Sequence, residues 1–174
     1  MATIEQLADA LNRTGRLVAG IRDDQWGKPT PCSEWDVRAL VNHVVNGTTA
    51  AASALGAETH PTAEYDEAAS MLLSAFGQPG ALDRIVTIPF GTVPGAVALH
   101  VRLTELLVHG WDIAQATSQR TDFPEELAEE ELAFSKAALE AVPPGRSPFA
   151  APQPVPEGAP ALDRLVAVLG REVK

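Results

Sequence analysis

Glu105 and His109 lie one helical turn apart in the segment HVRLTELLVHGWDIA, which is otherwise largely apolar. Side chains four positions apart on a helix emerge on the same side, with Cβ atoms about 5–6 Å apart. A carboxylate and an imidazole placed in this way can converge on one cation, and a buried carboxylate is costly unless it is paired or coordinated. The pattern therefore predicts a divalent metal site whose third ligand comes from elsewhere in the chain.

The best third donor is His43, in the second apolar and helix-like run, WDVRALVNHVV. The other two histidines fit less well, because His60 lies in a loop-like segment beside a proline and His100 lies on a different helix face from Glu105. The candidate ligand set is therefore His43, Glu105 and His109.

Cys32 is the only cysteine, which excludes an internal disulfide framework and a multi-cysteine zinc site. We predict that Ser33 caps the second helix, which places Cys32 eleven positions before His43. A rise of about 1.5 Å per residue then separates these two residues by roughly 15 Å along the helix axis, too far for a shared metal. Packing of Cys32 against Val37 is the more economical interpretation.

The helix stripe that carries Glu105 and His109 also allows interpretations without a metal. Its residues are Ala98, Arg102, Glu105, His109 and Asp112. In one alternative the stripe is a row of ion pairs, in which Arg102 binds Glu105. His109 would then bind Asp112 in the same way. In another alternative the stripe is a solvated seam at the edge of a bundle. Independently of the stripe, His43 could be a hydrogen-bonded core residue, as a lone histidine on an apolar helix often is. Residue types and spacing alone leave these alternatives open.

Apolar residues repeat every three or four positions along most of the chain, as in amphipathic helices. The predicted helices cover residues 3–21, Ser33 into the segment TTAAASALG, 62–76, Pro94 to about Thr117, Pro124–Val142 and the terminal ALDRLVAVLG. Residues 84–95 are predicted to be extended, as a connection or short hairpin, and the prolines at 143–160 prevent regular structure there. This order predicts an all-α fold, a four-helix bundle with short additional helices and a proline-rich C-terminal connection.

Length and composition fit one globular domain over residues 1–174, with a mean hydropathy near zero. The net charge of -10 argues against a nucleic-acid partner. Many of the acids lie in DFPEELAEEEL at 122–132, which we interpret as a solvated helix face. Neither a transmembrane segment nor a signal peptide is visible, so we expect no membrane partner and a cytoplasmic location.

Three segments of the sequence are similar to a known family. TPCSEWDVRALVNHVV, LTELLVHGWDIAQAT and APALDRLVAVLGR resemble the actinobacterial metal-binding proteins of the DinB/YfiT-like superfamily, in the branch related to mycothiol-dependent maleylpyruvate isomerase. The resemblance spans almost the whole chain and implies a DinB-like four-helix bundle with one divalent metal, usually zinc, on His43, Glu105 and His109. The isomerase carries a further C-terminal domain that helps to form its active site. For the sequence that ends at Lys174 we expect no such domain, so the resemblance supports the metal site more firmly than maleylpyruvate isomerisation.

Two imidazoles and one carboxylate leave a four-coordinate zinc with an open position, as in catalytic sites. Members of the superfamily often activate a low-molecular-weight thiol there. We therefore predict a metal-dependent transferase or isomerase that uses mycothiol or a related thiol to attack an electrophilic small molecule. The alternative is a non-catalytic metal-binding or sensing module. Nickel, iron and manganese also suit these ligands, and the resemblance makes a homodimer possible.

Residues around the ligand set have further candidate roles, and no catalytic residue is assigned. Arg102 could hold a carboxylate of the substrate or cofactor, or could instead form an ion pair with Glu105. Asp112 could orient a ligand imidazole through its second nitrogen, or could be a surface acid. The three tryptophans are interpreted as core anchors rather than stacking platforms, namely Trp26, Trp35 and Trp111.

Overall fold

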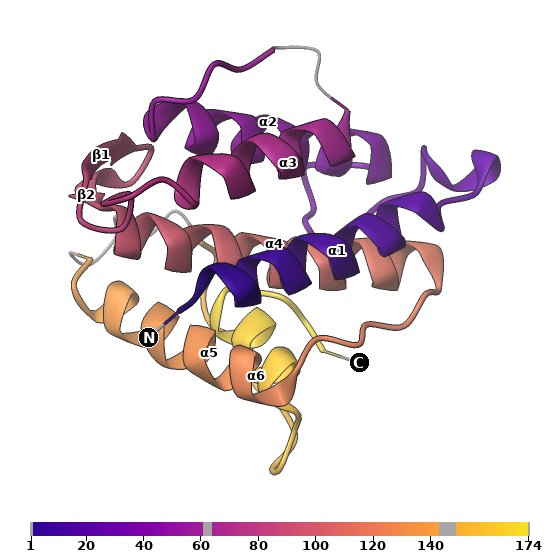
Figure 1. Cartoon of the computed structure of the whole chain (residues 1–174). Helices are drawn as coiled ribbons and strands as arrows, with labels where there is room; N and C mark the ends of the chain where they lie inside the picture. Colours follow the sequence, from indigo (N-terminus) through magenta and orange to yellow (C-terminus); the bar gives the residue numbers. More distant parts are fainter. Residues whose placement is uncertain (1, 61–63, 143–148, 174) are drawn as a thin grey trace.

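The computed structural model describes residues 2–60, 64–142 and 149–173. The elements along these residues are α1 (Ile4–Ala19), the short 3-10 helix η1 (Asp23–Gln25), α2 (Val37–Ala54), α3 (Tyr65–Phe76), β1 (Ile85–Ile88), β2 (Gly91–Pro94), α4 (Gly95–Thr117), α5 (Glu125–Glu140) and α6 (Ala161–Val168) (Figure 1). In this part of the chain the only strands form one two-stranded hairpin. The predicted all-α class is therefore confirmed.

The four helices α1 to α4 form the bundle. Helix α2 packs against α3 and α4, and α1 packs against α4 and α3. Helices α5 and α6 pack on each other and cover the opposite side of α4, so α4 lies between two layers of helices (Figure 1). This is the predicted DinB-like four-helix bundle with short additional helices.

Helix α4 is buried on nearly every face because it is the central element. It begins directly after Pro94, whose fixed φ suits the entry to a helix. Its apolar residues face α1 and α2 on one side and α5 and α6 on the other. Polar groups on such a helix have lost most of their water, so each requires a partner within the protein.

The start of α2 differs from the prediction. Asp36, not Ser33, caps this helix, and its side chain accepts a hydrogen bond of 2.8 Å from the amide of Ala39. The preceding residues form a turn, in which the hydroxyl of Thr30 donates to the carbonyl of Trp35 at 2.8 Å. This turn takes Cys32 off the helix axis, so the predicted separation along the axis was based on the wrong cap.

The hairpin of β1 and β2 lies at the N-terminal end of α4. Its strands are antiparallel, with Val86 paired to Val93, as the extended pattern at 84–95 allowed. The hairpin contacts both α2 and α4. Phe90, at its tip, is 52% exposed, which is unusual for a large apolar side chain.

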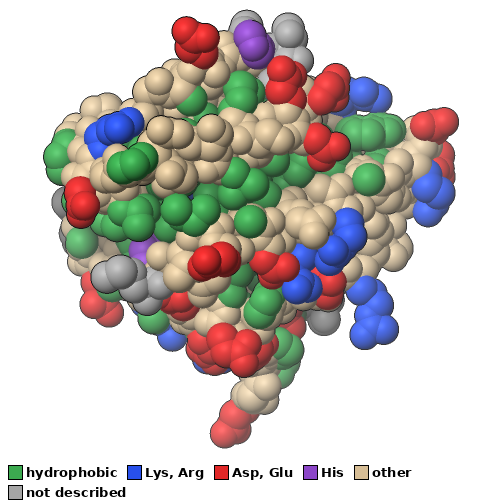
Figure 2. Space-filling view, in the orientation of Figure 1, with side chains coloured by type: hydrophobic (Ala, Val, Ile, Leu, Met, Phe, Trp, Pro, Cys, Tyr) green, Lys and Arg blue, Asp and Glu red, His purple; other side chains and the backbone are tan. Residues whose placement is uncertain are grey.

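The remaining predicted boundaries agree closely with the structure. The third helix begins at Tyr65, and the predicted residues 62 and 63 lie outside the described part of the chain. Within the proline-rich connection, residues 149–160 contain no helix or strand, and 143–148 lie outside the described part. Acidic side chains gather over α5 in Figure 2, as expected for a solvated face. Glu131 of the same acidic run is an exception, since it is fully buried, so the prediction of a solvated face is wrong at this residue. Among the described helices, none is long and apolar enough to cross a membrane.

Candidate metal centre

His43, Glu105 and His109 come together where α2 packs against α4. Each of the three offers a ligand atom, and these atoms all lie within 4.8 Å of one another. The Nε2 atom of His43 is 3.7 Å from Oε2 of Glu105, and the two imidazole rings are 5.0 Å apart at 84°. The structure thus brings together all three residues of the predicted ligand set.

The local sequence explains this convergence. His43 lies beside Leu40 and Val44, which are fully buried, so this edge of α2 is turned toward the interior of the bundle. On α4, the four-residue spacing of Glu105 and His109 places both side chains on the face that meets α2.

The ligand atoms lie within 4.8 Å of one another, which leaves room for a metal ion between them. Zinc binds nitrogen and oxygen ligands at about 2.0–2.1 Å, which places neighbouring tetrahedral ligands roughly 3.3 Å apart. The 3.7 Å separation between His43 and Glu105 is close to this value, and it is too long for a hydrogen bond. Two imidazoles and a carboxylate are also a ligand set that suits zinc.

Asp112 fixes the orientation of His109. The Nδ1 atom of His109 is 3.1 Å from Oδ2 of Asp112, which is fully buried. An ionised carboxylate only accepts hydrogen bonds, so Nδ1 carries the proton and Nε2 is the nitrogen available to a metal. Asp112 is therefore not a surface acid, which excludes that alternative.

Arg171 holds Asp112 from the C-terminal segment. Its Nη2 and Nε atoms donate to the two oxygens of Asp112 at 3.0 and 3.3 Å. Its Nη1 atom donates to the carbonyl of Leu169 at 3.1 Å. These buried contacts connect His109 through Asp112 to the C-terminal segment. The sequence analysis did not identify Arg171 as part of the site.

Arg102 provides a buried positive charge beside the cluster. Its Nη2 atom donates to Oε2 of Glu105 at 2.9 Å, while its Nε atom is buried without a hydrogen-bond partner among the described residues. A Cβ atom on Gly47 would lie only 2.6 Å from Nη1, so a larger residue at this position would push the guanidinium from where it now lies. The ion pair with Glu105 is thus present, and it uses only part of the hydrogen-bonding capacity of Arg102.

Both ion pairs of the metal-free alternative occur in the structure, but they leave the cluster incomplete. Arg102 uses one oxygen of Glu105, and Asp112 uses one nitrogen of His109. His43 lies 3.7 Å from the same oxygen of Glu105 that Arg102 binds, too far for a hydrogen bond, so neither ion pair accounts for the approach of His43. The solvated-seam alternative is excluded because the side chains of Glu105 and His109 are only 21% and 9% exposed.

The electrostatic surroundings favour the forms of these residues that bind metals. Burial lowers the pKa of the His43 imidazole below its usual value, and His109 acts in the same direction. Burial alone would raise the pKa of the Glu105 carboxyl group, but the charge of Arg102 and the two histidines outweigh it and lower this pKa. Neutral imidazole and ionised carboxylate are the ligand forms that a divalent metal requires.

Trp35 covers the cluster from the turn before α2. Its ring centroid lies 4.3 Å from that of His43 and 6.1 Å from that of His109. Trp35 packs against a buried hydrophobic cluster, as predicted for a core anchor, but it is only half-buried and its ring also lies against a candidate ligand. No spacing rule could have found this contact, because the turn at Thr30 brings Trp35 to His43.

Comparison with known proteins places the chain in a family. The family model described as "Mycothiol maleylpyruvate isomerase N-terminal domain" matches residues 7–83. Two proteins of Mycobacterium tuberculosis, from different strains and both described as uncharacterized, are 41% identical over 167 residues, or 91% of this chain and 91% of each relative. This chain belongs to the mycothiol maleylpyruvate isomerase N-terminal domain family. No solved structure matches it.

The match to this family confirms the resemblance found in the sequence. The matched residues include His43 but end before Glu105 and His109. The family assignment therefore does not depend on the complete ligand cluster, and the geometry of that cluster is an independent observation.

Cys32 and His60 lie outside the ligand cluster of this family member. Cys32 is half-buried and unpaired by any disulfide, and burial raises the pKa of its thiol despite an opposing effect of Arg171. His60 is exposed. The prediction that neither residue is a ligand agrees with this geometry, although the argument for Cys32 used the wrong helix cap.

Two cavities adjoin the cluster. The inner cavity, of about 200 Å³, is lined by His43, Gly47, Arg102 and Glu105 together with alanines of α2 and residues 86–90 of the hairpin. The apolar cavity, of about 420 Å³, lies between α4, α5 and the hairpin, and Glu105 also lines it. A small molecule in either cavity would thus lie beside a candidate metal ligand.

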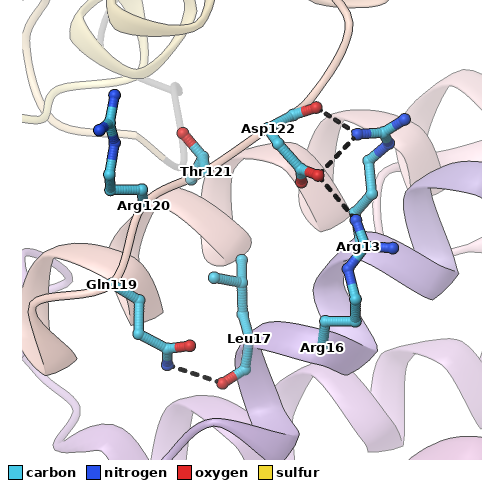
Figure 3. Close-up of a pocket in the computed structure, with 7 residues that line it drawn as sticks. All are labelled: Arg13, Arg16, Leu17, Gln119, Arg120, Thr121 and Asp122. Atoms are coloured by element: carbon cyan, nitrogen blue, oxygen red, sulfur yellow. Dashed lines mark hydrogen bonds and ion pairs between the residues drawn. The ribbon is translucent and has the colours of Figure 1, made fainter.

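A third cavity lies away from the cluster, between the C-terminal part of α1 and the loop that follows α4 (Figure 3). It has a volume of about 420 Å³. Arg13 and Arg16 point toward Asp122 and contact its Oδ2 atom at 2.9 and 2.7 Å. These contacts join α1 to the loop and pair the charges of both arginines, so this cavity has no evident role in the chemistry of the cluster.

Proposed function

We propose that this protein binds one divalent metal ion at His43, Glu105 and His109, and that it is a metal-dependent transferase or isomerase. Its cofactor would be mycothiol or a related low-molecular-weight thiol, and its substrate an electrophilic small molecule. The convergence of three donors from two helices carries this proposal. Family membership supports the thiol, because the family is described by a mycothiol-dependent reaction.

The protein residues would hold the metal in a fixed geometry. Asp112 orients His109, and Arg171 in turn holds Asp112, so the Nε2 lone pair of His109 is directed in advance. Such outer contacts commonly change metal affinity by about 10–100-fold. Trp35 packs over His43 and limits the movement of its ring.

Zinc bound by these three residues would keep an open position that favours a thiolate over a thiol, which supplies a nucleophile at neutral pH. Cys32 does not supply this nucleophile in our proposal, since burial raises the pKa of its thiol. The sulfur would therefore come from a free thiol compound.

Arg102 is our candidate for binding a carboxylate of the cofactor or substrate. Arg102 is 6% exposed and lines the inner cavity, and its guanidinium has hydrogen-bonding capacity beyond the contact with Glu105. An anionic group in the inner cavity would meet this charge at the edge of the metal site.

Metal analysis of the purified protein tests the first part of the proposal. We expect about one divalent ion per chain after zinc loading, and loss of that ion in Glu105→Gln. His60→Ala is the matched control, because it removes an exposed histidine away from the cluster. Absence of stoichiometric metal from the zinc-loaded protein would contradict the proposal.

Thiol conjugation tests the second part. Consumption of mycothiol, or of another low-molecular-weight thiol, is followed with monochlorobimane or chlorodinitrobenzene before and after removal of the metal by a chelator. We expect conjugation that is lost with the metal and restored by zinc. Bound zinc without metal-dependent conjugation across several thiols would instead favour the non-catalytic metal-binding or sensing module.

A further inference from the structure

The apolar cavity has the size and lining of a site for a small, mainly hydrophobic molecule. Its volume of about 420 Å³ lies in the usual range for ligand pockets, about 300–1,000 Å³. Its walls are mostly aliphatic and aromatic, and include Val97, Val101, Phe134 and Leu139. None of the described residues that line it is a lysine, arginine or histidine.

The position of the apolar cavity connects it to the candidate metal centre. Val101 and Glu105, one helical turn apart on α4, line both the apolar and the inner cavity. Phe90 at the hairpin tip also lines both. A molecule whose body fills the apolar cavity would therefore present one end at Glu105, beside the ligand cluster.

One hydrogen-bonding group on the wall is held in a defined orientation. The hydroxyl of Thr104 lines the apolar cavity and donates to Oε2 of Glu131 at 2.8 Å. Glu131 is fully buried, and its Oε1 atom lies 2.8 Å from Nδ1 of His100. Because the Thr104 proton is directed at Glu131, only the oxygen lone pairs remain for a ligand. Thr104 can thus accept a hydrogen bond from a ligand, but it has no proton to donate.

The charges near the apolar cavity disfavour an anionic ligand. Glu105 lies on its wall and Glu131 lies directly behind Thr104, while Arg102 lines only the inner cavity. A carboxylate placed among the apolar walls would lose its hydration without meeting a cation from any lining residue that the structure describes. An uncharged molecule avoids this cost.

We propose that the apolar cavity binds the electrophilic substrate, and that this substrate is an uncharged, mainly apolar molecule with one hydrogen-bond donor that faces Thr104. This inference rests on the proposed function, since it assigns the substrate class of that same site. It places the polar thiol compound outside the apolar cavity, so any carboxylate bound by Arg102 would belong to the thiol compound and not to this substrate.

Three naphthalene probes test the chemical class. We would measure binding of 1-naphthol, 1-methoxynaphthalene and 1-naphthoate by isothermal titration calorimetry, with metal-free and zinc-loaded protein. The naphthol keeps the donor, the methyl ether lacks it, and the naphthoate is an anion. We expect 1-naphthol to bind about 3- to 10-fold more tightly than the ether, which is the usual effect of one hydrogen bond. Naphthoate binding as tight as that of naphthol would overturn the proposal.

Two valine variants test the location. Val97→Trp fills the apolar cavity two helical turns before Glu105, so we expect it to abolish 1-naphthol binding and to leave zinc binding unchanged. Val18→Trp is the matched control, because Val18 is also a half-buried helical valine but lines none of the three cavities. Unchanged naphthol binding in Val97→Trp would contradict the proposed location.

Two threonine variants test the hydrogen bond. In Thr104→Val the preference for 1-naphthol over its methyl ether should disappear, whereas Thr104→Ser should retain it. If Thr104→Val fails to fold, the comparison of the three probes on the unmodified protein still tests the chemical class of the ligand. A preference that survives in folded Thr104→Val would show that another group accepts the bond.

The outcomes separate this inference from the proposed function. In one outcome the protein binds no zinc but binds 1-naphthol, and Val97→Trp abolishes that binding. This result would contradict the metal-dependent function and would leave the apolar cavity as a hydrophobic ligand site. Zinc binding with thiol conjugation, but without naphthol binding, would contradict the substrate class alone.

Discussion

Helix α4 carries two buried clusters in which a carboxylate meets an imidazole, and they differ in how completely the carboxylate is satisfied. In the first, Glu131 receives contacts of 2.8 Å from both His100 and Thr104. In the second, Arg102 donates to Oε2 of Glu105 at 2.9 Å, but the candidate ligand His43 stays 3.7 Å from that oxygen, beyond hydrogen-bond distance. The first cluster is a closed hydrogen-bonded group. The second has donor atoms that converge without satisfying one another, which is the arrangement that a metal ion would complete.

This comparison shows why a buried acid beside a histidine is not enough to predict a metal site. Both clusters contain these residue types, and both are largely withdrawn from water. Only the cluster at Glu105 brings a second imidazole from another helix. The distances between donors, rather than the residue types, distinguish a ligand set from a hydrogen-bonded pair.

The largest expected difference between the clusters is in zinc affinity. Glu105→Gln should weaken zinc binding by at least about 100-fold, because it removes a charged ligand. The loss of a ligand should lower the affinity more than the loss of an outer contact does. Glu131→Gln should change zinc affinity by less than about threefold, since Glu131 is outside the cluster. Competition with a chromophoric chelator measures both constants. Equal losses in the two variants would remove the distinction between the clusters.

The second prediction concerns the support of the ligands. Asp112→Asn should weaken zinc binding by about 10-fold, because a neutral amide holds His109 and Arg171 less firmly than a carboxylate. Asp163→Asn is the matched control, since Asp163 also accepts a hydrogen bond from α4, at 3.2 Å from Trp111, but is remote from the ligands. Zinc affinity that is the same in both variants would mean that Asp112 has only a structural role.

The third prediction concerns the stability of the metal-free protein, for which the cluster at Glu131 should be important. Glu131→Gln should lower the free energy of unfolding of the metal-free protein by about 1–3 kcal/mol, since His100 and Thr104 lose a charged buried acceptor. Glu129→Gln, on the exposed side of α5, should cost less than about 1 kcal/mol. Urea denaturation followed by circular dichroism measures both. A stability loss no larger than that of Glu129→Gln would show that the closed cluster contributes little.

The two clusters also show what the sequence could and could not predict. The ligand residues on α4 followed from a four-residue spacing within one helix, and helix spacing depends only on local geometry. Glu131 was grouped with a solvated acidic run. Its position on the same face as Leu127, Ala128 and Ser135, all buried, was a signal that could have identified it. Its partners on α4 could not be predicted, because they depend on how α5 packs.

Contacts made by turns were the least predictable part of the site. Trp35 reaches His43 only because the chain turns between Thr30 and Asp36, and the sequence suggested a helix beginning at Ser33 instead. The same turn decides where Cys32 lies. The contact between Arg171 and Asp112 joins residues from α4 and the C-terminal segment, which no short-range pattern relates.

The smallest expected effect on zinc affinity is that of replacing Cys32, which tests whether this residue lies outside the ligand set. Cys32→Ser should leave zinc affinity unchanged within about twofold, because Cys32 is outside the ligand set. Since burial raises the pKa of this thiol, less of it is ionised at a given pH, and its alkylation by iodoacetamide at pH 8 should be slower than that of free cysteine. Mass spectrometry follows the alkylation, and a chelator competition gives the affinity. A large loss of zinc affinity in Cys32→Ser would mean that sulfur from the protein itself takes the position that we assign to an external thiol.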